Sequence, residues 1–313
     1  MGGGGNAFGG GYTPGAYKDI IRESYEKTRD TKFETVVNEM INEQLTEYGR
    51  DSVTTREHLD EIKKIIQEDN IGTIEMRFGG SVSRHTYVDG LSDVDILIMI
   101  DKSELSDMPP LDIREYIKTK LNDNLSNIEE IHTGNLAVTV KFSDGEKIQL
   151  LPTIRRGEGY KISDKNNDNW SNVIRPDKFA EKLTEVNRDC NGKVVPVIKL
   201  VKDINDQLPE DQQLKGYHME SIAIEVFKSY PDSNSKTPKA MLRYFFEKAK
   251  DIVRHPIKDR TNQSIHVDDY LGQEDSIDRT RISYTLDRIA RKIKNADEIG
   301  SVYEWKSILG MNE

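Results

Sequence analysis

The chain has 313 residues, 35% of them hydrophobic and 32% charged, and a formal net charge of −10. This acidic balance disfavours a protein that mainly holds duplex nucleic acid, because phosphate neutralisation dominates such affinity. It does not exclude nucleotide substrates. The single cysteine, Cys190, excludes an intrachain disulfide framework and favours a cytoplasmic location. The sequence has no run of 18 apolar residues, so we expect no membrane span.

The first third of the chain predicts two helices after a Gly-rich tail. We expect residues 1–13 to be flexible, because most of them are glycine. Thr13-Pro14 is a helix-start signal, and apolar residues at three- and four-residue spacing continue the helix to about Tyr48, allowing a break near Arg29-Asp30. A capping box at residues 54–57 begins the next helix.

Four strands follow from alternating or continuous apolar runs. We expect strands at Thr73–Phe78 and Asp93–Asp101, then a helix after Pro109-Pro110. Leu136–Phe142 and Glu146–Leu151 form a hairpin around an Asp-Gly turn, and Pro152 is expected to end its second strand. The first half is therefore a mixed α/β unit.

The second half reads as helical. A polar loop at 155–175 precedes helices expected at about 176–190, 193–207, 216–230, 237–254 and 276–296, with a surface loop at 256–274. We therefore predict a tail at 1–13, an α/β core at 14–160 and a helical lobe at 161–313.

The stretch from Phe78 to Ile100 carries the chemistry. Asp93 and Asp95 lie on the same face of their strand, because side chains alternate along a strand. Two neighbouring carboxylates repel each other unless a cation lies between them, and Mg²⁺ commonly binds such a pair together with substrate phosphates. The preceding turn, with Gly80 and Ser81, offers backbone N–H donors and close approach for a phosphate.

This pattern resembles the signature of the polymerase-β-like nucleotidyltransferases. Four further stretches are similar to the cGAS/DncV-like nucleotidyltransferases, the CD-NTases of bacterial anti-phage defence: Lys147–Pro152, Val195–Lys202, Gly216–Glu220 and Trp305–Gly310. The resemblance implies an α+β fold, with a polymerase-β-like palm of mixed sheet and flanking helices plus a C-terminal helical lobe.

The same resemblance implies the reaction and its partners. A 3′-OH would attack an α-phosphate with loss of pyrophosphate, until NTPs close into a cyclic di- or trinucleotide. It implies a two-metal Mg²⁺ site, with Mn²⁺ as a substitute, and a downstream effector that binds the product without contacting the enzyme. We expect a cytoplasmic monomer without a nucleic-acid activator.

Individual site residues also follow from the resemblance. Asp93 and Asp95 match the metal pair, and Gly80 and Ser81 match the turn that holds the donor triphosphate. Lys202, with Lys199 one turn before it, matches a phosphate-binding lysine, against the alternative of a solvated helix face. Tyr217 matches an aromatic residue that stacks on a base, and we interpret its neighbours His218 and Glu220 as structural.

Gln149 departs from the family pattern, because it stands where the family has a third acidic residue. An amide oxygen can coordinate a cation, but an amide cannot take a proton. Three interpretations remain open: Gln149 acts as a neutral ligand or orients the acceptor hydroxyl, Asp144 or Asp168 supplies the missing acid, or the chain is an attenuated nucleotide-binding relative. A nucleotidyltransferase for tRNA, protein or a small molecule is the alternative enzyme.

Overall fold

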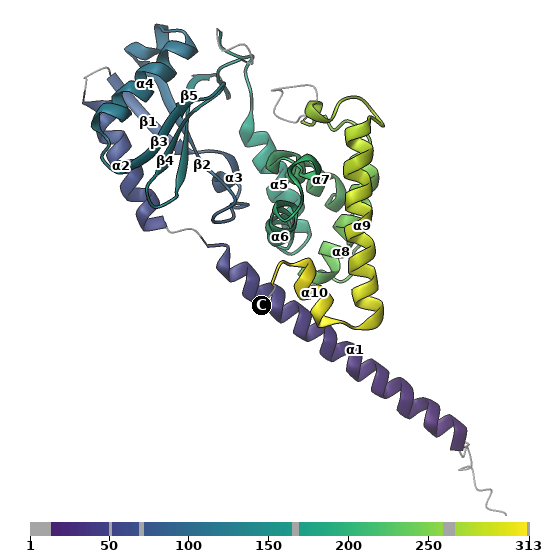
Figure 1. The fold of residues 1–313 in the computed structure, drawn as a ribbon. Coiled ribbons are helices and arrows are strands. Elements are labelled where there is room, and N and C mark those ends of the chain that lie inside the picture. The colour runs from purple at the N-terminus through teal and green to yellow at the C-terminus, as the bar shows by residue number, and fades with distance from the viewer. Residues whose placement is uncertain (1–13, 50–51, 69–71, 165–168, 259–266, 312–313) are drawn as a thin grey trace, which may run out of the picture.

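The computed structural model describes residues 14–49, 52–68, 72–164, 169–258 and 267–311. A mixed β-sheet with flanking helices lies beside a helical lobe. One long helix, α1 (Pro14–Glu47), extends from the sheet past the lobe (Figure 1). This arrangement confirms the predicted α+β class. The predicted tail at 1–13 lies outside the described residues.

The sheet has the order β1-β2-β5-β4-β3, with β6 paired to the far end of β5. Among the strand pairs of the described residues, only β2 and β5 run parallel, and the others are antiparallel. The strands are β1 (Gly72–Phe78), β2 (Val94–Ser103), β3 (Ile128–Thr133), β4 (Val138–Phe142), β5 (Lys147–Arg156) and β6 (Gly159–Lys161).

Alternation along β2 separates the core from the site. Val94, Ile96, Ile98 and Ile100 are at most 1% exposed and pack in one core with α2 (Ser52–Gln67) and α4 (Pro110–Asn124). The opposite face of the strand therefore carries Asp95, as the two-residue period requires. A four-residue helix, α3 (Gly80–Ser83), forms the turn after β1.

The second core joins the helices of the lobe, and the first five of them match the predicted helical segments. The helices are α5 (Pro176–Asp189), α6 (Val194–Asp206), α7 (Gly216–Phe227), α8 (Pro238–Ile252), α9 (Ile277–Ile299) and α10 (Val302–Ile308). Helix α1 (Pro14–Glu47) is continuous through Arg29-Asp30, so the allowed break is absent there. Its buried Val37 and Ile41 belong to the core of the lobe. The boundary near residue 160 stays a prediction.

Three features of the sheet differ from the sequence prediction. β5 continues past Pro152 to Arg156, since its pairing with β4 ends at Leu150 while the parallel pairing with β2 continues. A proline is tolerated where only one neighbouring strand remains. The edge strand β3 and the short β6 were not predicted, because β3 buries no residue fully and β6 has three residues.

Candidate active site

The centre of the site is the start of β2, where β5 runs alongside it. Asp95 is in register with Gln149 across the parallel pair. Nε2 of Gln149 donates a hydrogen bond to Oδ2 of Asp93 at 2.5 Å. The three predicted residues therefore lie together, and the amide contacts a carboxylate directly.

Gly80 allows the turn after β1 to approach Asp95. Its φ is +47°, and a Cβ built there would lie 1.5 Å from Oδ2 of Asp95. The N–H of Gly79 also donates to the carbonyl oxygen of Asp95 at 2.7 Å. Only glycine fits this position, because both the left-handed backbone and the contact exclude a side chain.

Burial and charge both act on Asp95. Burial is the largest cause that raises the pKa of its carboxyl, to about 6, and the negative charges of Asp93 and Glu220 add to it. Arg84 and Lys202 oppose the rise by stabilising the charged form. A cation beside Asp93 and Asp95 would relieve the same cost.

The donor set fits Mg²⁺ held jointly with a nucleotide. Two carboxylates and one amide oxygen are hard ligands, and Mg²⁺ is commonly held by one or two carboxylates plus substrate phosphates. Within the described ranges, no three His, Cys, Asp or Glu residues are grouped as metal ligands. The set at Asp93 and Asp95 is therefore smaller than a three-carboxylate site.

Of the two acids proposed as substitutes for Gln149, the structure describes Asp144, and it is not grouped with Asp93 and Asp95 as a third metal ligand. Asp144 lies in the turn before β5, where its Oδ2 is 2.7 Å from Nε2 of His58 and its Oδ1 accepts from the N–H of Glu146. These contacts, after an opposing effect of burial, hold the pKa of Asp144 below its usual value. Asp168 lies outside the described residues.

A cavity of about 350 Å³ between the sheet and the lobe brings most of the predicted residues together. Its lining includes Ser81, Asp93, Asp95, Gln149, Lys202 and Tyr217. Gly80 and Lys199 are absent from its lining. Lys199 is half-buried on α6, and burial, together with the charge of Lys202, lowers the pKa of its ammonium.

The wall of this cavity contains a buried ionic cluster that joins the two lobes. Glu220 of α7 accepts hydrogen bonds from Nε of Arg84 at 2.6 Å, Nζ of Lys202 at 3.0 Å and Oγ1 of Thr86 at 2.5 Å. We call Arg84, Thr86, Lys202 and Glu220 the interlobe cluster. Arg84 was missed in the sequence because it falls between the two recognised parts of the motif.

Tyr217 lies in the same cavity, at the start of α7. Its ring is 4.5 Å from that of Phe179, and the Arg84 guanidinium carbon is 5.7 Å from the Tyr217 ring centre. Tyr217 is only partly buried. Tyr217 lines the cavity, and its stacking on a base stays a prediction.

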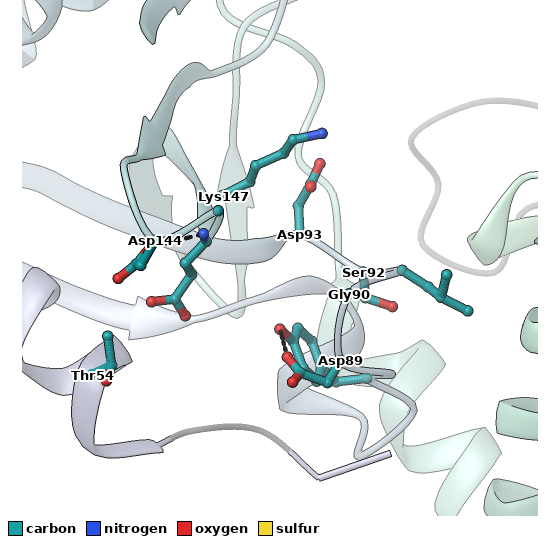
Figure 2. Close-up of a pocket in the computed structure, with 11 residues that line it drawn as sticks. Thr54, Asp89, Gly90, Ser92, Asp93, Asp144 and Lys147 are labelled. Atoms are coloured by element: carbon teal, nitrogen blue, oxygen red, sulfur yellow. Dashed lines mark hydrogen bonds between the residues drawn. The ribbon is translucent and has the colours of Figure 1, made fainter. Parts of the chain in front are cut away.

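A second cavity, of about 540 Å³, lies on the sheet side of Asp93. Figure 2 shows Asp93 between the loop at Gly90–Ser92 and the hairpin that carries Asp144 and Lys147. Leu91, Ser92 and Asp93 line both cavities. The two spaces therefore share a wall at Asp93, which gives room for two reactants on either side of this carboxylate.

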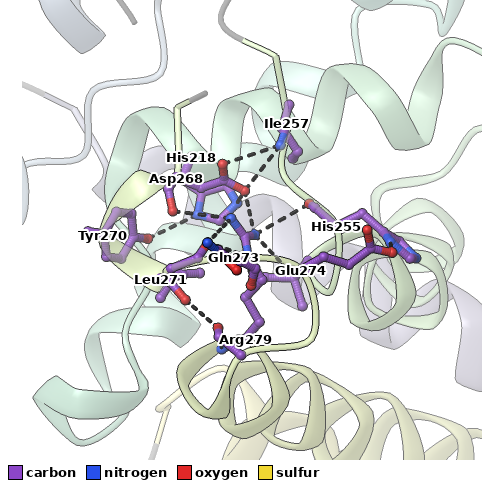
Figure 3. Close-up of polar contacts among 12 residues, drawn as sticks. His218, His255, Ile257, Asp268, Tyr270, Leu271, Gln273, Glu274 and Arg279 are labelled. Atoms are coloured by element: carbon purple, nitrogen blue, oxygen red, sulfur yellow. Dashed lines mark hydrogen bonds and ion pairs between the residues drawn. The ribbon is translucent and has the colours of Figure 1, made fainter. Parts of the chain in front are cut away.

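A second buried cluster holds the start of α7 in place (Figure 3). Nδ1 of His218 is 3.0 Å from the hydroxyl of Tyr270, and Asp268 accepts from Nη1 of Arg279 at 2.6 Å. The Tyr270 hydroxyl also accepts from the N–H of Lys215 at 3.1 Å. Asp268 is fully buried, so the predicted surface loop at 256–274 is wrong for this part of the segment.

Residues 59–158 match the family model of the nucleotidyltransferase domain. Over 173 residues the chain is 25% identical to a cyclic AMP-AMP-AMP synthase of Acinetobacter sp., a match that covers 54% of this chain. The match spans about half of that relative, 48% of its length.

Three solved structures show the same fold. CdnC of E. coli MS115-1 with ATP has a TM-score of 0.62 at 14% identity, covering 90% of this chain and 97% of its own. The CD-NTase CdnG of Bradyrhizobium diazoefficiens with GTP has a TM-score of 0.64 at 12% identity, with 82% and 88% covered. Vibrio cholerae DncV cyclic AMP-GMP synthase with a linear intermediate has a TM-score of 0.59 at 11% identity, with 96% and 90% covered.

Among the described helices, none is both long enough and apolar enough to cross a membrane. The domain match lies over the sheet and the carboxylate pair, and the fold likeness extends through the helical lobe. Residues 59–158 therefore match a nucleotidyltransferase domain, and the chain has the fold of the CD-NTases, as the sequence predicted.

Proposed function

We propose that the chain joins NTPs into a cyclic di- or trinucleotide that acts as a signal in anti-phage defence. The observation that carries this proposal is the cavity between sheet and lobe, which holds Asp93, Asp95, Ser81 and Tyr217 together. Relatives described as a cyclic AMP-AMP-AMP synthase and a cyclic AMP-GMP synthase support the product class.

In this reaction a 3′-oxygen bonds to an α-phosphorus while the bond to pyrophosphate breaks. Ser81 and the backbone N–H groups of α3 can donate to the triphosphate, because Gly80 keeps the turn close to β2. Tyr217 can hold a base by stacking. Mg²⁺ bound by Asp93 and Asp95 would supply positive charge at the reacting oxygens.

Gln149 sets a limit on the proton transfer. Its Nε2 already donates to Asp93, so its amide oxygen is the atom left to accept from an incoming hydroxyl. An amide is not basic at neutral pH, and the proton must therefore pass to a carboxylate or to water. Gln149 is an orienting group in this proposal.

The test is incubation of the chain with four labelled NTPs and either Mg²⁺ or Mn²⁺. A phosphatase-resistant product is expected from the wild-type chain and not from the Asp93→Ala/Asp95→Ala double variant. If the folded wild-type chain forms no product with either metal, the proposal is wrong.

Two other outcomes separate the alternatives. Label appearing on added tRNA, protein or small molecule would identify a transferase for another acceptor. Metal-dependent NTP binding without any turnover would identify an attenuated relative, the candidate that the Gln149–Asp93 hydrogen bond favours.

A further inference from the structure

The ammonium of Lys202 is fully engaged by the protein. Its Nζ lies 2.9 Å from the carbonyl oxygen of Thr86, 3.0 Å from Oε1 of Glu220 and 3.4 Å from Oγ1 of Thr86. The residue is 7% exposed. A lysine has three N–H donors, so these three acceptors leave none for a phosphate.

Arg84 is engaged differently. Its Nε donates to Oε2 of Glu220 at 2.6 Å, and its side chain is 12% exposed. A guanidinium has five N–H donors. Within the described part of the chain, Nη1 and Nη2 make no hydrogen bond, and neither is a buried atom without a partner. Four donors of Arg84 are therefore available, and the residue lines the cavity.

Aromatic and acidic neighbours hold this guanidinium in one place. Its central carbon is 5.4 Å from the ring centre of Phe179 and 5.7 Å from that of Tyr217. The hydrogen bond from Nε of Arg84 to Glu220 fixes the orientation of the guanidinium. A planar fork held this way is pre-organised for two parallel hydrogen bonds to a phosphate.

The interlobe cluster also carries an excess positive charge. Arg84 and Lys202 both form ion pairs with the carboxylate of Glu220, which is fully buried. The second positive charge of the cluster is balanced from the cavity, where the carboxylate of Asp95 interacts with both cations. Because Lys202 has no donor to offer, an anionic group in the cavity would meet Arg84 first.

We infer that Arg84 is the cationic ligand of the nucleotide phosphates, with Glu220 as its positioning residue and Lys202 as a structural cation. The inference rests on the proposed function for its ligand class, a nucleoside triphosphate. It moves the phosphate contact from the helical lobe to the turn after α3, next to Ser81. It also makes the contact dependent on the two lobes being joined.

The test is calorimetric titration of the full chain with α,β-methylene analogues of the four NTPs in MgCl₂. These analogues replace the bond that would break, so binding is measured without turnover. We expect Arg84→Ala to weaken binding of every analogue by about 10- to 100-fold, the effect of losing a hydrogen bond to a charged group. The preference among bases should stay unchanged, since all four share the triphosphate.

Variants of the same cluster separate ligand from scaffold. Arg84→Lys keeps the charge but loses the fork, so we expect an intermediate loss. We expect Lys202→Met to weaken binding by less than about 3-fold, the size of effect expected for a residue that does not contact the ligand. Cooperative unfolding of the variant would show that it is folded. Arg188→Ala, which removes an exposed positive charge on α5, is the matched control and should not change binding.

Glu220→Gln gives the positioning readout. It should weaken binding in the wild-type background and have no further effect in Arg84→Ala, because residues that act through each other are not additive. An unchanged dissociation constant in folded Arg84→Ala, or an equal loss in Lys202→Met, would overturn the inference. A chain that binds no analogue would overturn both proposals. If the chain binds the analogues through Arg84 but forms no product, only the proposed synthase activity would be overturned.

Discussion

Nε2 of Gln149 and Oδ2 of Asp93 form a 2.5 Å hydrogen bond where β2 and β5 run in parallel. The amide places a hydrogen-bond donor against Asp93 where a third carboxylate would repel it, while the charges of Asp93 and Asp95 still repel each other. It also occupies one oxygen of the predicted metal pair. Without a cation, the site therefore has less repulsion than a site with a third carboxylate. It also has one negative charge fewer to attract a cation.

The first prediction exchanges this contact for a repulsion. Gln149→Glu keeps the length of the side chain and places a third carboxylate against Asp93. We expect the free energy of unfolding in EDTA to fall by about 1–3 kcal/mol, because a donor is lost beside a charged acceptor. Mg²⁺ should restore more stability in the variant than in the wild type, which urea unfolding with and without MgCl₂ would measure.

Gln213→Glu is the control for this substitution. Gln213 lines the same cavity but donates to the carbonyl oxygens of Leu208 and Asp206. Its variant should lose stability without a larger response to Mg²⁺. Equal Mg²⁺ responses in both variants would show that Gln149 is not at the cation site.

The sequence predicted the parts of the fold that local pattern controls. The run of apolar residues in β2 is buried on one face, and the glycine turn before it lies against Asp95. The helices of the lobe follow from their apolar spacing. The strand β3 could not be found this way, because an edge strand whose six positions are all exposed or half-exposed has no strong alternation.

The partners of the site residues could not be predicted from spacing. The ammonium of Lys202 donates a hydrogen bond to Thr86, a residue 116 positions earlier in the chain, and this contact holds the ammonium in a buried position. The position of the Arg84 side chain depends on its hydrogen bond to Glu220, which lies 136 positions later. Such pairs form only where the two lobes meet, and the periodicity of one segment cannot predict which residues meet there.

A second prediction concerns Gly80. Gly80→Ala should lower the free energy of unfolding by at least about 2 kcal/mol, because it adds backbone strain and a clash with Asp95. Gly192→Ala is the matched control, since Gly192 has a φ of +74° and no atom within 4 Å of a built Cβ. It should cost only the strain, about 1 kcal/mol. Equal losses in urea unfolding would contradict the close approach of Gly80 to Asp95.

A third prediction follows from the raised pKa of Asp95. Because its pKa is about 6 in the fold and near 3.8 unfolded, ionising it costs stability as the pH rises from about 4 to 6. Asp95→Asn should therefore stabilise the metal-free chain at pH 7.5 by up to about 3 kcal/mol. The same variant should lose Mg²⁺-dependent NTP binding. Asp232→Asn, at an exposed position, should change neither quantity.

A fourth prediction has the opposite sign and concerns His218. Burial lowers the pKa of its imidazole to about 4, from an ordinary value of 6.5, with Asp268 opposing this shift and Arg279 adding to it. As the pH falls below about 6.5, the unfolded chain binds a proton that the folded chain does not. This one group should therefore cost about 2 kcal/mol of stability between pH 7.5 and pH 5.

His218→Gln isolates that contribution, because the other titrating groups remain in both proteins. The variant should be less stable at pH 7.5, where it loses the packing of a fully buried ring. Its additional loss on acidification to pH 5 should be smaller than that of the wild type by about 2 kcal/mol. His132→Gln, an exposed position on β3, should keep the wild-type pH dependence. If His218→Gln and wild type lose the same stability between the two pH values in urea unfolding, the imidazole of His218 is not held neutral by its burial against Tyr270 and Asp268.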